Sequence, residues 1–152
     1  NNNPLPVTFG YMESLDAFFA TQKDITVTGS SNYSIKLVRP LAQINVGTTG
    51  TPIQASFKAK DSPDTFHPFT NTVSGKTDFI WNFSNTTTET FPVDGTAYNY
   101  LAMGYLFAPT EAMWIVAELT LTDGENSKTV EFPQVEIEAN QRSNIAGGFT
   151  AK

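Results

Sequence analysis

Short segments in which apolar and polar residues alternate recur along the chain, and turn residues separate them. In one of them, Ile53, Ala55, Phe57 and Ala59 alternate with polar side chains. A period of two residues is that of a β-strand, whose successive side chains point to opposite faces. No segment of useful length has the helical period, so the helices that would connect a parallel sheet are not expected. The sequence therefore predicts an all-β domain.

The expected strands are residues 25–28, 33–38, 41–46, 53–60, 78–84, 89–93, 98–107, 113–122, 128–132, 135–137 and 144–150. The further side chains expected to face the core are Phe79, Trp81, Phe83, Ile115, Ala117, Leu119 and Leu121. Residues 98–107 are apolar on both faces, which predicts a central strand. Residues 123–126, with the sequence DGEN, predict a hairpin turn. Many short strands joined by turns favour an antiparallel β-sandwich with Greek-key connections.

Two segments fit this pattern less simply. Residues 11–21 carry Leu15, Phe18 and Phe19 at helical spacing, and they predict either one or two helical turns or an irregular packed segment. Pro40 stands between two strand-like segments, where it cannot donate a ladder hydrogen bond. It therefore predicts a sheet edge, a bulge, or a point where the chain leaves one sheet for another.

The length of 152 residues suits one domain, so residues 1–152 are expected to form a single unit, with residues 1–30 as an irregular lead-in and a longer precursor as the source. The net charge is −6 and the basic residues are scattered. A clustered basic surface is needed to bind phosphates, so neither nucleic acid nor an acidic membrane surface is an expected partner. The chain has no cysteine, which excludes disulfides and thiolate chemistry.

Residues that would carry catalysis are sparse. His67 is the single histidine, and no nucleophile-elbow motif accompanies it. One histidine without cysteine does not make an ordinary zinc site. Acidic pairs in expected turns, such as Asp61 with Asp64, do not follow the spacing of a calcium-binding EF-hand loop. We therefore expect no enzyme, no catalytic or metal-binding residue, and no cofactor.

Trp114 is the aromatic residue that stands apart from the expected core. It is out of phase with the inward-facing residues of the strand that contains it. An exposed tryptophan on a β-sandwich suits a partner surface. The sequence therefore marks Trp114 as a candidate contact for a glycan or a host protein.

Three segments together resemble the fimbrillin-like superfamily, which comprises type V pilus subunits and related surface lipoproteins of anaerobic gut and oral bacteria. The segments are residues 12–48, which contain LVRPLAQIN, residues 98–109, with the sequence YNYLAMGYLFAP, and residues 135–152, which contain NQRSNIAGG. The LVRPLAQIN and NQRSNIAGG elements are the most specific of these. They resemble structural signatures of the superfamily and not catalytic ones.

The resemblance implies transthyretin-like β-sandwich domains at the cell surface or outer membrane, held there by a lipid anchor on the precursor. It implies a structural or adhesin subunit of a fimbria, whose partners are neighbouring pilus subunits joined by β-strand addition. The candidate wall of the groove that accepts the strand consists of Ile35, Leu37, Ala42, Ile44 and Val46. Two alternatives remain: these residues are closed core, or the chain is a surface lipoprotein that binds a host glycan or protein and does not polymerise.

Overall fold

The computed structural model describes residues 7–8, 16–30, 32–51, 54–83 and 89–151. Its strands are β1 (Val7–Thr8), β2 (Leu41–Thr48), β3 (Gln54–Ser62), β4 (Thr65–His67), β5 (Thr72–Ser74), β6 (Thr77–Phe83), β7 (Thr90–Val93), β8 (Thr96–Phe107), β9 (Met113–Asp123), β10 (Asn126–Ile137) and β11 (Arg142–Gly147). These residues contain no helix, and hence none that could cross a membrane. The prediction of an all-β chain is confirmed.

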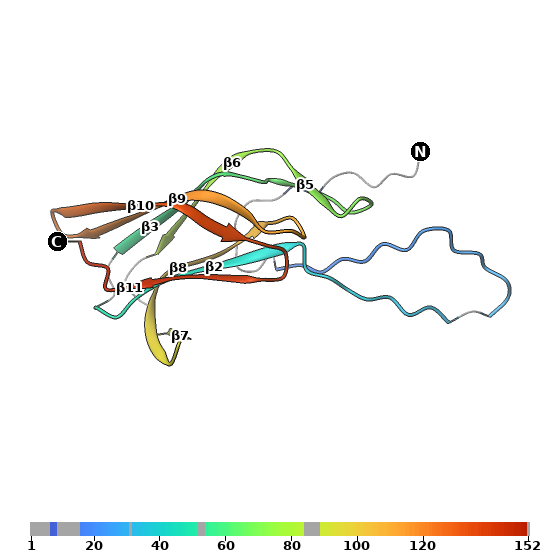
Figure 1. Cartoon of the computed structure of the whole chain (residues 1–152), viewed down its shortest axis with the longest axis horizontal. Coiled ribbons are helices and arrows are strands. Elements are labelled where there is room, and N and C mark those ends of the chain that lie inside the picture. The colour runs from blue at the N-terminus through green and yellow to red at the C-terminus, as the bar shows by residue number, and fades with distance from the viewer. Residues whose placement is uncertain (1–6, 9–15, 31, 52–53, 84–88, 152) are drawn as a thin grey trace.

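Two four-stranded sheets make up the body of the molecule. One has the order β10-β9-β3-β6 and the other has the order β11-β2-β8-β7. The two sheets lie face to face (Figure 1), and side chains from both form the main core. A third, smaller sheet has the order β1-β4-β5. As its apolar faces predicted, β8 is an inner strand, placed between β2 and β7.

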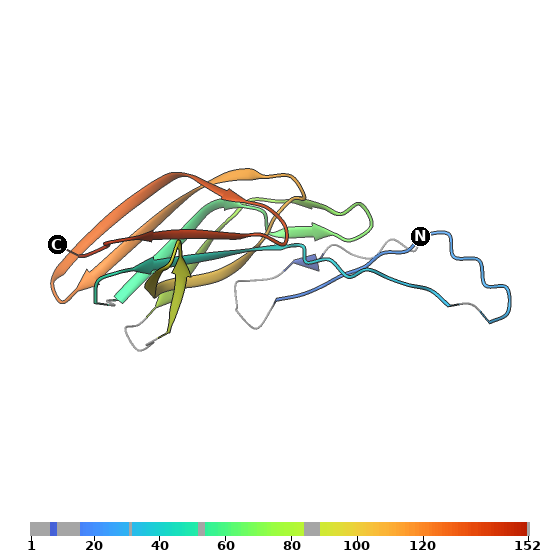
Figure 2. The same ribbon diagram turned by 60° about the horizontal axis from the view of Figure 1, so that its bottom comes forward.

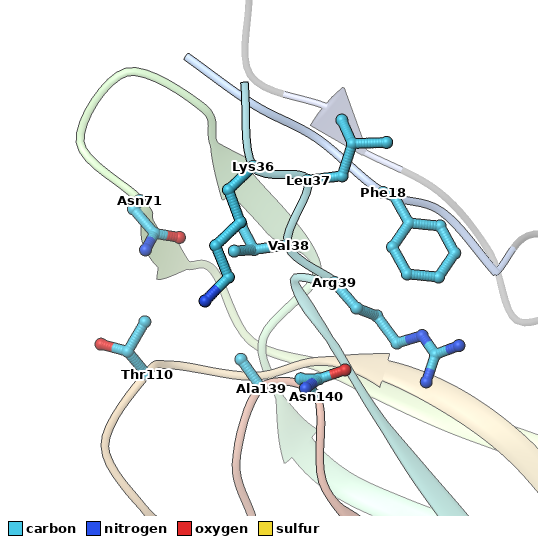
Figure 3. Close-up of a pocket in the computed structure, with 9 residues that line it drawn as sticks. All are labelled: Phe18, Lys36, Leu37, Val38, Arg39, Asn71, Thr110, Ala139 and Asn140. Carbon is cyan, nitrogen blue, oxygen red and sulfur yellow. The ribbon is translucent and has the colours of Figure 1, made fainter. Parts of the chain in front are cut away.

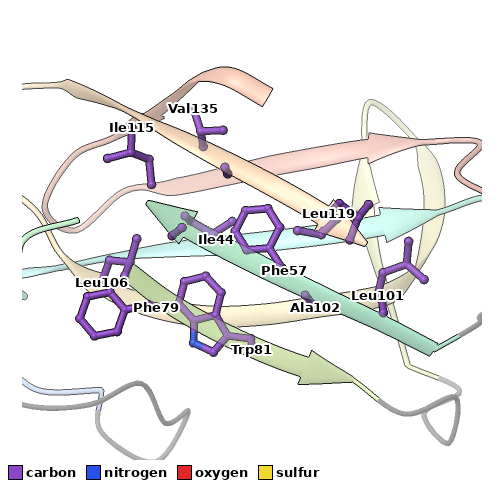
Figure 4. Packing of buried hydrophobic residues seen from close by; sticks show 14 of the residues in the cluster. Ile44, Phe57, Phe79, Trp81, Leu101, Ala102, Leu106, Ile115, Leu119 and Val135 are labelled. Carbon is purple, nitrogen blue, oxygen red and sulfur yellow. The ribbon is translucent and has the colours of Figure 1, made fainter. Parts of the chain in front are cut away.

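The main core forms because the strands alternate as the sequence indicates (Figure 4). Phe57 is fully buried on β3, and its ring stacks on Trp81 of β6 with 5.5 Å between centroids. Trp81 fills the space above Gly104 of β8, where an added Cβ would lie 2.3 Å from the indole. Among the residues expected to face the core, Ala55, Phe57, Ala59, Phe79, Trp81, Ile115, Ala117, Leu119 and Leu121 are buried and Phe83 is half-buried. Ile53 lies outside the described residues.

The turn chemistry explains two of the hairpins. Gly124 has a φ of 60° in the two-residue loop between β9 and β10, which confirms the turn predicted at residues 123–126. A positive φ at the first loop position is typical of a type II′ turn. Between β7 and β8, Asp94 and Gly95 both have positive φ, as a type I′ turn requires. Both turns match the twist of their strands and fix the register of the hairpins.

Several sequence predictions were wrong. Residues 25–28 and 33–38 are extended but belong to no strand, apart from an isolated bridge between Phe19 and Val38. Of the two alternatives for residues 11–21, the helical one is wrong for residues 16–21, which are irregular and pack through Phe19, and residues 11–15 lie outside the described part. The short strands β4 and β5 were not predicted because neither has an alternation long enough to register. Residues 128–132 and 135–137 form one strand, β10, which continues through a register shift between Phe132 and Val135.

The pairing is not wholly antiparallel. β11 pairs with β2 in parallel, from Arg142 opposite Gln43 to Gly147 opposite Thr48. No crossover helix is needed to connect them, because between β2 and β11 in the sequence the chain forms the strands of the other large sheet. The parallel pair places the polar residues of the C-terminal segment beside those of β2 on one face of the sheet.

Pro40 lies between an extended segment and the start of β2. Its side chain is buried, and its carbonyl oxygen accepts a hydrogen bond from the Ala108 N–H at 3.1 Å. Because β2 is flanked by β11 and β8, the interpretation of Pro40 as an edge-strand residue is wrong. The proline instead marks the point at which the chain enters the sheet, one residue before β2 begins.

An ion pair between Lys58 of β3 and Asp78 of the edge strand β6 makes the stability of the fold depend on pH. Asp78 accepts a hydrogen bond from Lys58 at 2.7 Å and one from the Asp61 N–H at 3.1 Å, and these two contacts lower the pKa of Asp78. A lowered pKa stabilises the fold above the ordinary aspartate value of about 3.9, and this stabilisation is lost as the pH falls through the folded-state pKa. We expect Asp78→Asn to lower the urea midpoint at pH 7 and to leave it nearly unchanged near pH 2. An equal loss at both pH values would contradict this account.

Candidate functional site

A long arm projects from the sheets. We define the arm as residues 16–30 and 32–39, which run out from the body and return to it just before β2. Figures 1 and 2 show that the arm extends past the ends of both sheets, on the side opposite the β9–β10 turn. It is the most extended part of the described chain, and we take it as the candidate functional site.

The two ends of the arm are fastened to each other. Arg39 Nη2 donates a hydrogen bond to Asp16 Oδ2 at 2.8 Å, and Arg39 Nε lies 2.8 Å from Asp16 Oδ1. Such a two-point contact between guanidinium and carboxylate fixes both distance and orientation. Next to it, Phe19 and Val38 exchange two backbone hydrogen bonds of 2.9 Å each. The guanidinium of Arg39 also lies 4.9 Å from the ring centroid of Phe18.

The first leg of the arm is also attached to the body. The Phe19 ring packs edge-on against Phe66 of β4, with 4.5 Å between centroids, and Phe66 stacks on Phe107 of β8. These rings belong to a second, smaller core. Farther out, Thr21 donates a hydrogen bond to the Pro68 carbonyl. The part of the arm next to the body, residues 16–21 and 38–39, which we call its root, is therefore anchored.

The distal arm, which we define as residues 24–30 and 32–37, has few such contacts. Within the described residues, its one hydrogen bond between the two legs runs from the Tyr33 hydroxyl to the Thr26 carbonyl at 2.9 Å. Its exposed apolar side chains are Ile25, Val27, Tyr33, Ile35 and Leu37, with Val27 76% and Leu37 62% exposed. They recur at every second position on each leg, so in extended chain they lie on one side of each leg. Exposed apolar surface is often found where proteins contact a partner.

A cavity of about 240 Å³ lies between the part of the arm that contains residue 18 and residues 36–39 and the loops at the ends of the sheets. Its lining residues are Phe18, Lys36, Leu37, Val38, Arg39, Asn71, Thr110, Ala139 and Asn140. In Figure 3, Lys36 points toward Thr110 and Ala139, whereas Leu37 points to the other side of the arm. The second leg is thus extended and stands off from the body.

The structure does not bring the five predicted groove residues into one surface. Ile35 and Leu37 are exposed on the distal arm, whereas Ala42, Ile44 and Val46 are at most 1% exposed and belong to the main core. For these three residues on β2, the alternative of closed core is therefore the correct description. Pro40 separates the two groups, because the arm ends and the sheet begins at this residue.

Trp114 lies where its phase predicted. It is 60% exposed on β9, opposite Glu136 of β10, on the outer face of the β10-β9-β3-β6 sheet. The same face carries an ion pair between Lys60 and Glu118. The Trp114 side chain therefore points away from the core, on a face of the sheet that also carries charged side chains.

The imidazole of His67 contacts the side chain of one neighbouring residue, Ser74. Its Nε2 lies 2.7 Å from Ser74 Oγ across the β4–β5 hairpin. Among the described residues, no three His, Asp or Glu side chains are grouped closely enough to hold a metal ion. The pair of His67 and Ser74 is exposed on a short hairpin, which suits a surface hydrogen bond.

Sequence reasoning did not identify the Asp16–Arg39 pair or the role of Ile25, Val27 and Tyr33. Alternation at residues 25–28 and 33–38 did indicate extended chain. It could not indicate that the segments would lack a partner strand, because the same alternation is found in paired strands.

The fold and the arm define an all-β domain that carries a projecting apolar arm. A model for a family of unknown function (DUF6562) matches residues 5–152, and the chain belongs to this family. A comparison with curated proteins finds no match.

Proposed function

We propose that the chain is a non-enzymatic structural subunit that joins other copies of itself by β-strand addition, with the arm as the strand that is donated. The observation that carries this proposal is the distal arm, where extended backbone and alternating exposed apolar residues occur together. In strand addition, backbone hydrogen bonds supply affinity and alternate side chains fill pockets on the acceptor. Ile35 and Leu37 are two such side chains, and burial of each contributes about 1.5–3 kcal/mol.

The acceptor in this proposal is the free edge of β6. The outer strands of the two large sheets are β10, β6, β11 and β7. β10 contains Pro133 and a register shift, and β7 contains Pro92. Prolines and bulges of this kind protect an edge strand from pairing with another chain. The start of β11 faces β10, since Ser143 donates a hydrogen bond to the Glu136 carbonyl. β6 contains no proline, and among the described strands it pairs on one side, with β3.

The resemblance to the fimbrillin-like superfamily extends the proposal. On this basis we propose that the two sheets form a Greek-key, transthyretin-like sandwich and that the protein is a subunit or adhesin of a fimbria. Its place would be the cell surface or outer membrane, and its partners would be neighbouring subunits. The LVRPLAQIN element supports this extension, since it spans the junction of arm and β2.

A second candidate function is a surface module that binds a host glycan or protein and does not polymerise. The exposed Trp114 on β9 favours it. The two candidates differ in what the arm does: only the first requires the arm to contact another copy.

The test is the mass of the wild-type chain as a function of concentration. We expect light scattering to report masses that rise above that of the 16.6 kDa monomer, and electron microscopy to show linear assemblies. A chain with residues 24–37 replaced by a short glycine-serine linker should stay monomeric and folded. A wild-type chain that stays monomeric at millimolar concentration would contradict the proposal, and so would a variant without the arm that still assembles as the wild type does.

A further inference from the structure

A cleft of about 480 Å³ lies on the outer face of the β11-β2-β8-β7 sheet, away from the distal arm. Ile44 on β2 faces the main core, so its neighbours Gln43 and Asn45 point to the outer face. Gln43 stands opposite Tyr105 of β8 on one side and Arg142 of β11 on the other. These three residues line the cleft together. Phe83 at the end of β6 and Glu89 just before β7 also line the cleft, so the site draws on both large sheets.

Described residues cover the outer face at both of its ends. At one end, Leu41, Phe66 and Phe107 form the smaller core. At the other end, Phe91 of β7 packs against Gly47, where an added Cβ would lie 2.5 Å from the phenylalanine ring. Figure 1 shows β7 projecting away from the rest of its sheet. The cleft is thus a bounded hollow.

The floor beside the cleft is a chain of amides. Gln43 Nε2 donates to Asn45 Oδ1 at 2.9 Å, and Asn45 Nδ2 donates to Asn144 Oδ1 at 2.9 Å. Asn45 is fully buried, although it lies on an inner strand where an apolar residue would be ordinary. Hydrogen-bonded amides hold one another in place, so the Gln43 side chain is presented to the cleft in a fixed position.

The walls combine aromatic rings with two opposite charges. Tyr100, Met103 and Tyr105 of β8 supply half-buried apolar surface, and Arg142 and Glu89 are exposed at the rim. A tyrosine offers a flat apolar ring with a polar tip. Arginine and glutamate supply donors and acceptors that suit neighbouring hydroxyl groups. Their charges cancel, so the cleft gives no preference for an anion.

We propose that this cleft binds a neutral oligosaccharide. A sugar ring has an apolar C–H face that packs on an aromatic ring, and hydroxyl groups at its edge that both donate and accept hydrogen bonds. Tyr100 and Tyr105 are five positions apart on β8, and both line the cleft because a register shift between Ala102 and Tyr100 interrupts the alternation of the strand. At a rise of about 3.3 Å per residue, their separation is at most roughly 16 Å. That span exceeds one sugar ring, so the ligand is a chain of sugars. This site is separate from the arm and does not depend on assembly.

The test uses cellotetraose, xylotetraose, maltotetraose and mannotetraose as probes, with the corresponding monosaccharides beside them. Isothermal titration calorimetry should show binding of at least one tetrasaccharide about tenfold or more tighter than its monosaccharide, which is about 1.4 kcal/mol. Arg142→Gln and Glu89→Gln change exposed side chains and should each weaken that binding about tenfold. Trp114→Ala, an exposed aromatic residue on the other sheet, should bind as the wild type does.

Absence of binding to all four tetrasaccharides would overturn the proposal. So would a loss of binding in Trp114→Ala with none in Arg142→Gln, since the sugar would then lie on the other sheet. Binding confined to a sialylated or sulfated glycan would overturn the assignment of a neutral ligand. The circular dichroism of each variant confirms that it is folded before binding is compared.

Discussion

Replacement of Ile35 and Leu37 together by aspartate is expected to weaken self-association at least about a hundredfold. Each side chain contributes about 1.5–3 kcal/mol when buried, and about 1.4 kcal/mol corresponds to a tenfold change in affinity. Both side chains are exposed in the isolated chain, by 55% and 62%, so the free energy of unfolding of the monomer should change by less than about 0.5 kcal/mol. Analytical ultracentrifugation measures the first quantity and urea unfolding the second.

The control for this pair is Val116→Asp. Val116 is also an exposed apolar residue, but it lies on the outer face of β9 and not on the arm. The Val116→Asp variant should self-associate with the same affinity as the wild-type chain. If Val116→Asp and the double variant lose association equally, the effect is one of added charge, and the arm has no special role.

Replacement of Phe57 by alanine is expected to destabilise the fold by about 3–5 kcal/mol, the usual cost of a large cavity in a core. Phe57 is fully buried at the centre of β3 and stacks on Trp81. Trp81 cannot move far to fill the space, because its indole is held against Gly104. For a chain of this length the Tm should fall by roughly 10 °C. Calorimetry measures the Tm, and urea unfolding measures the free energy.

Ile80→Ala is the matched control for Phe57→Ala. Ile80 lies on the neighbouring strand β6 but points to the outer face, where it is partly exposed. Its loss should cost less than about 1 kcal/mol. A Phe57→Ala variant as stable as Ile80→Ala would show that the face-to-face packing of the sheets is not the main source of stability.

The alternation of side chains predicted the core well, and the physical reason is local. On β9, Ile115, Ala117, Leu119 and Leu121 repeat every second residue, and a strand must turn these four to the same side. Turn chemistry is local as well, which is why Gly124 could be placed in a hairpin loop from the sequence alone. Both predictions needed only neighbouring residues.

The partner of a strand is not a local property, and here sequence reasoning failed. Ile35 and Ile44 occur in segments with the same alternation, yet one is exposed on the arm and the other is buried between sheets. The oligosaccharide cleft was missed for a related reason. Its floor joins Asn45 to Asn144, 99 positions along the chain, and only the parallel pairing of β2 with β11 brings them together.

The most direct test of strand addition is hydrogen exchange of the assembled protein compared with the monomer. Strand addition forms new backbone hydrogen bonds on the donor and on the acceptor. The amides of residues 32–37 on the arm and those of β6, Thr77–Phe83, should therefore exchange more slowly in the assembly, while β10 should be unchanged. Assembly with an unprotected arm, or with protection of β10 and none of β6, would contradict the proposed donor or the proposed acceptor.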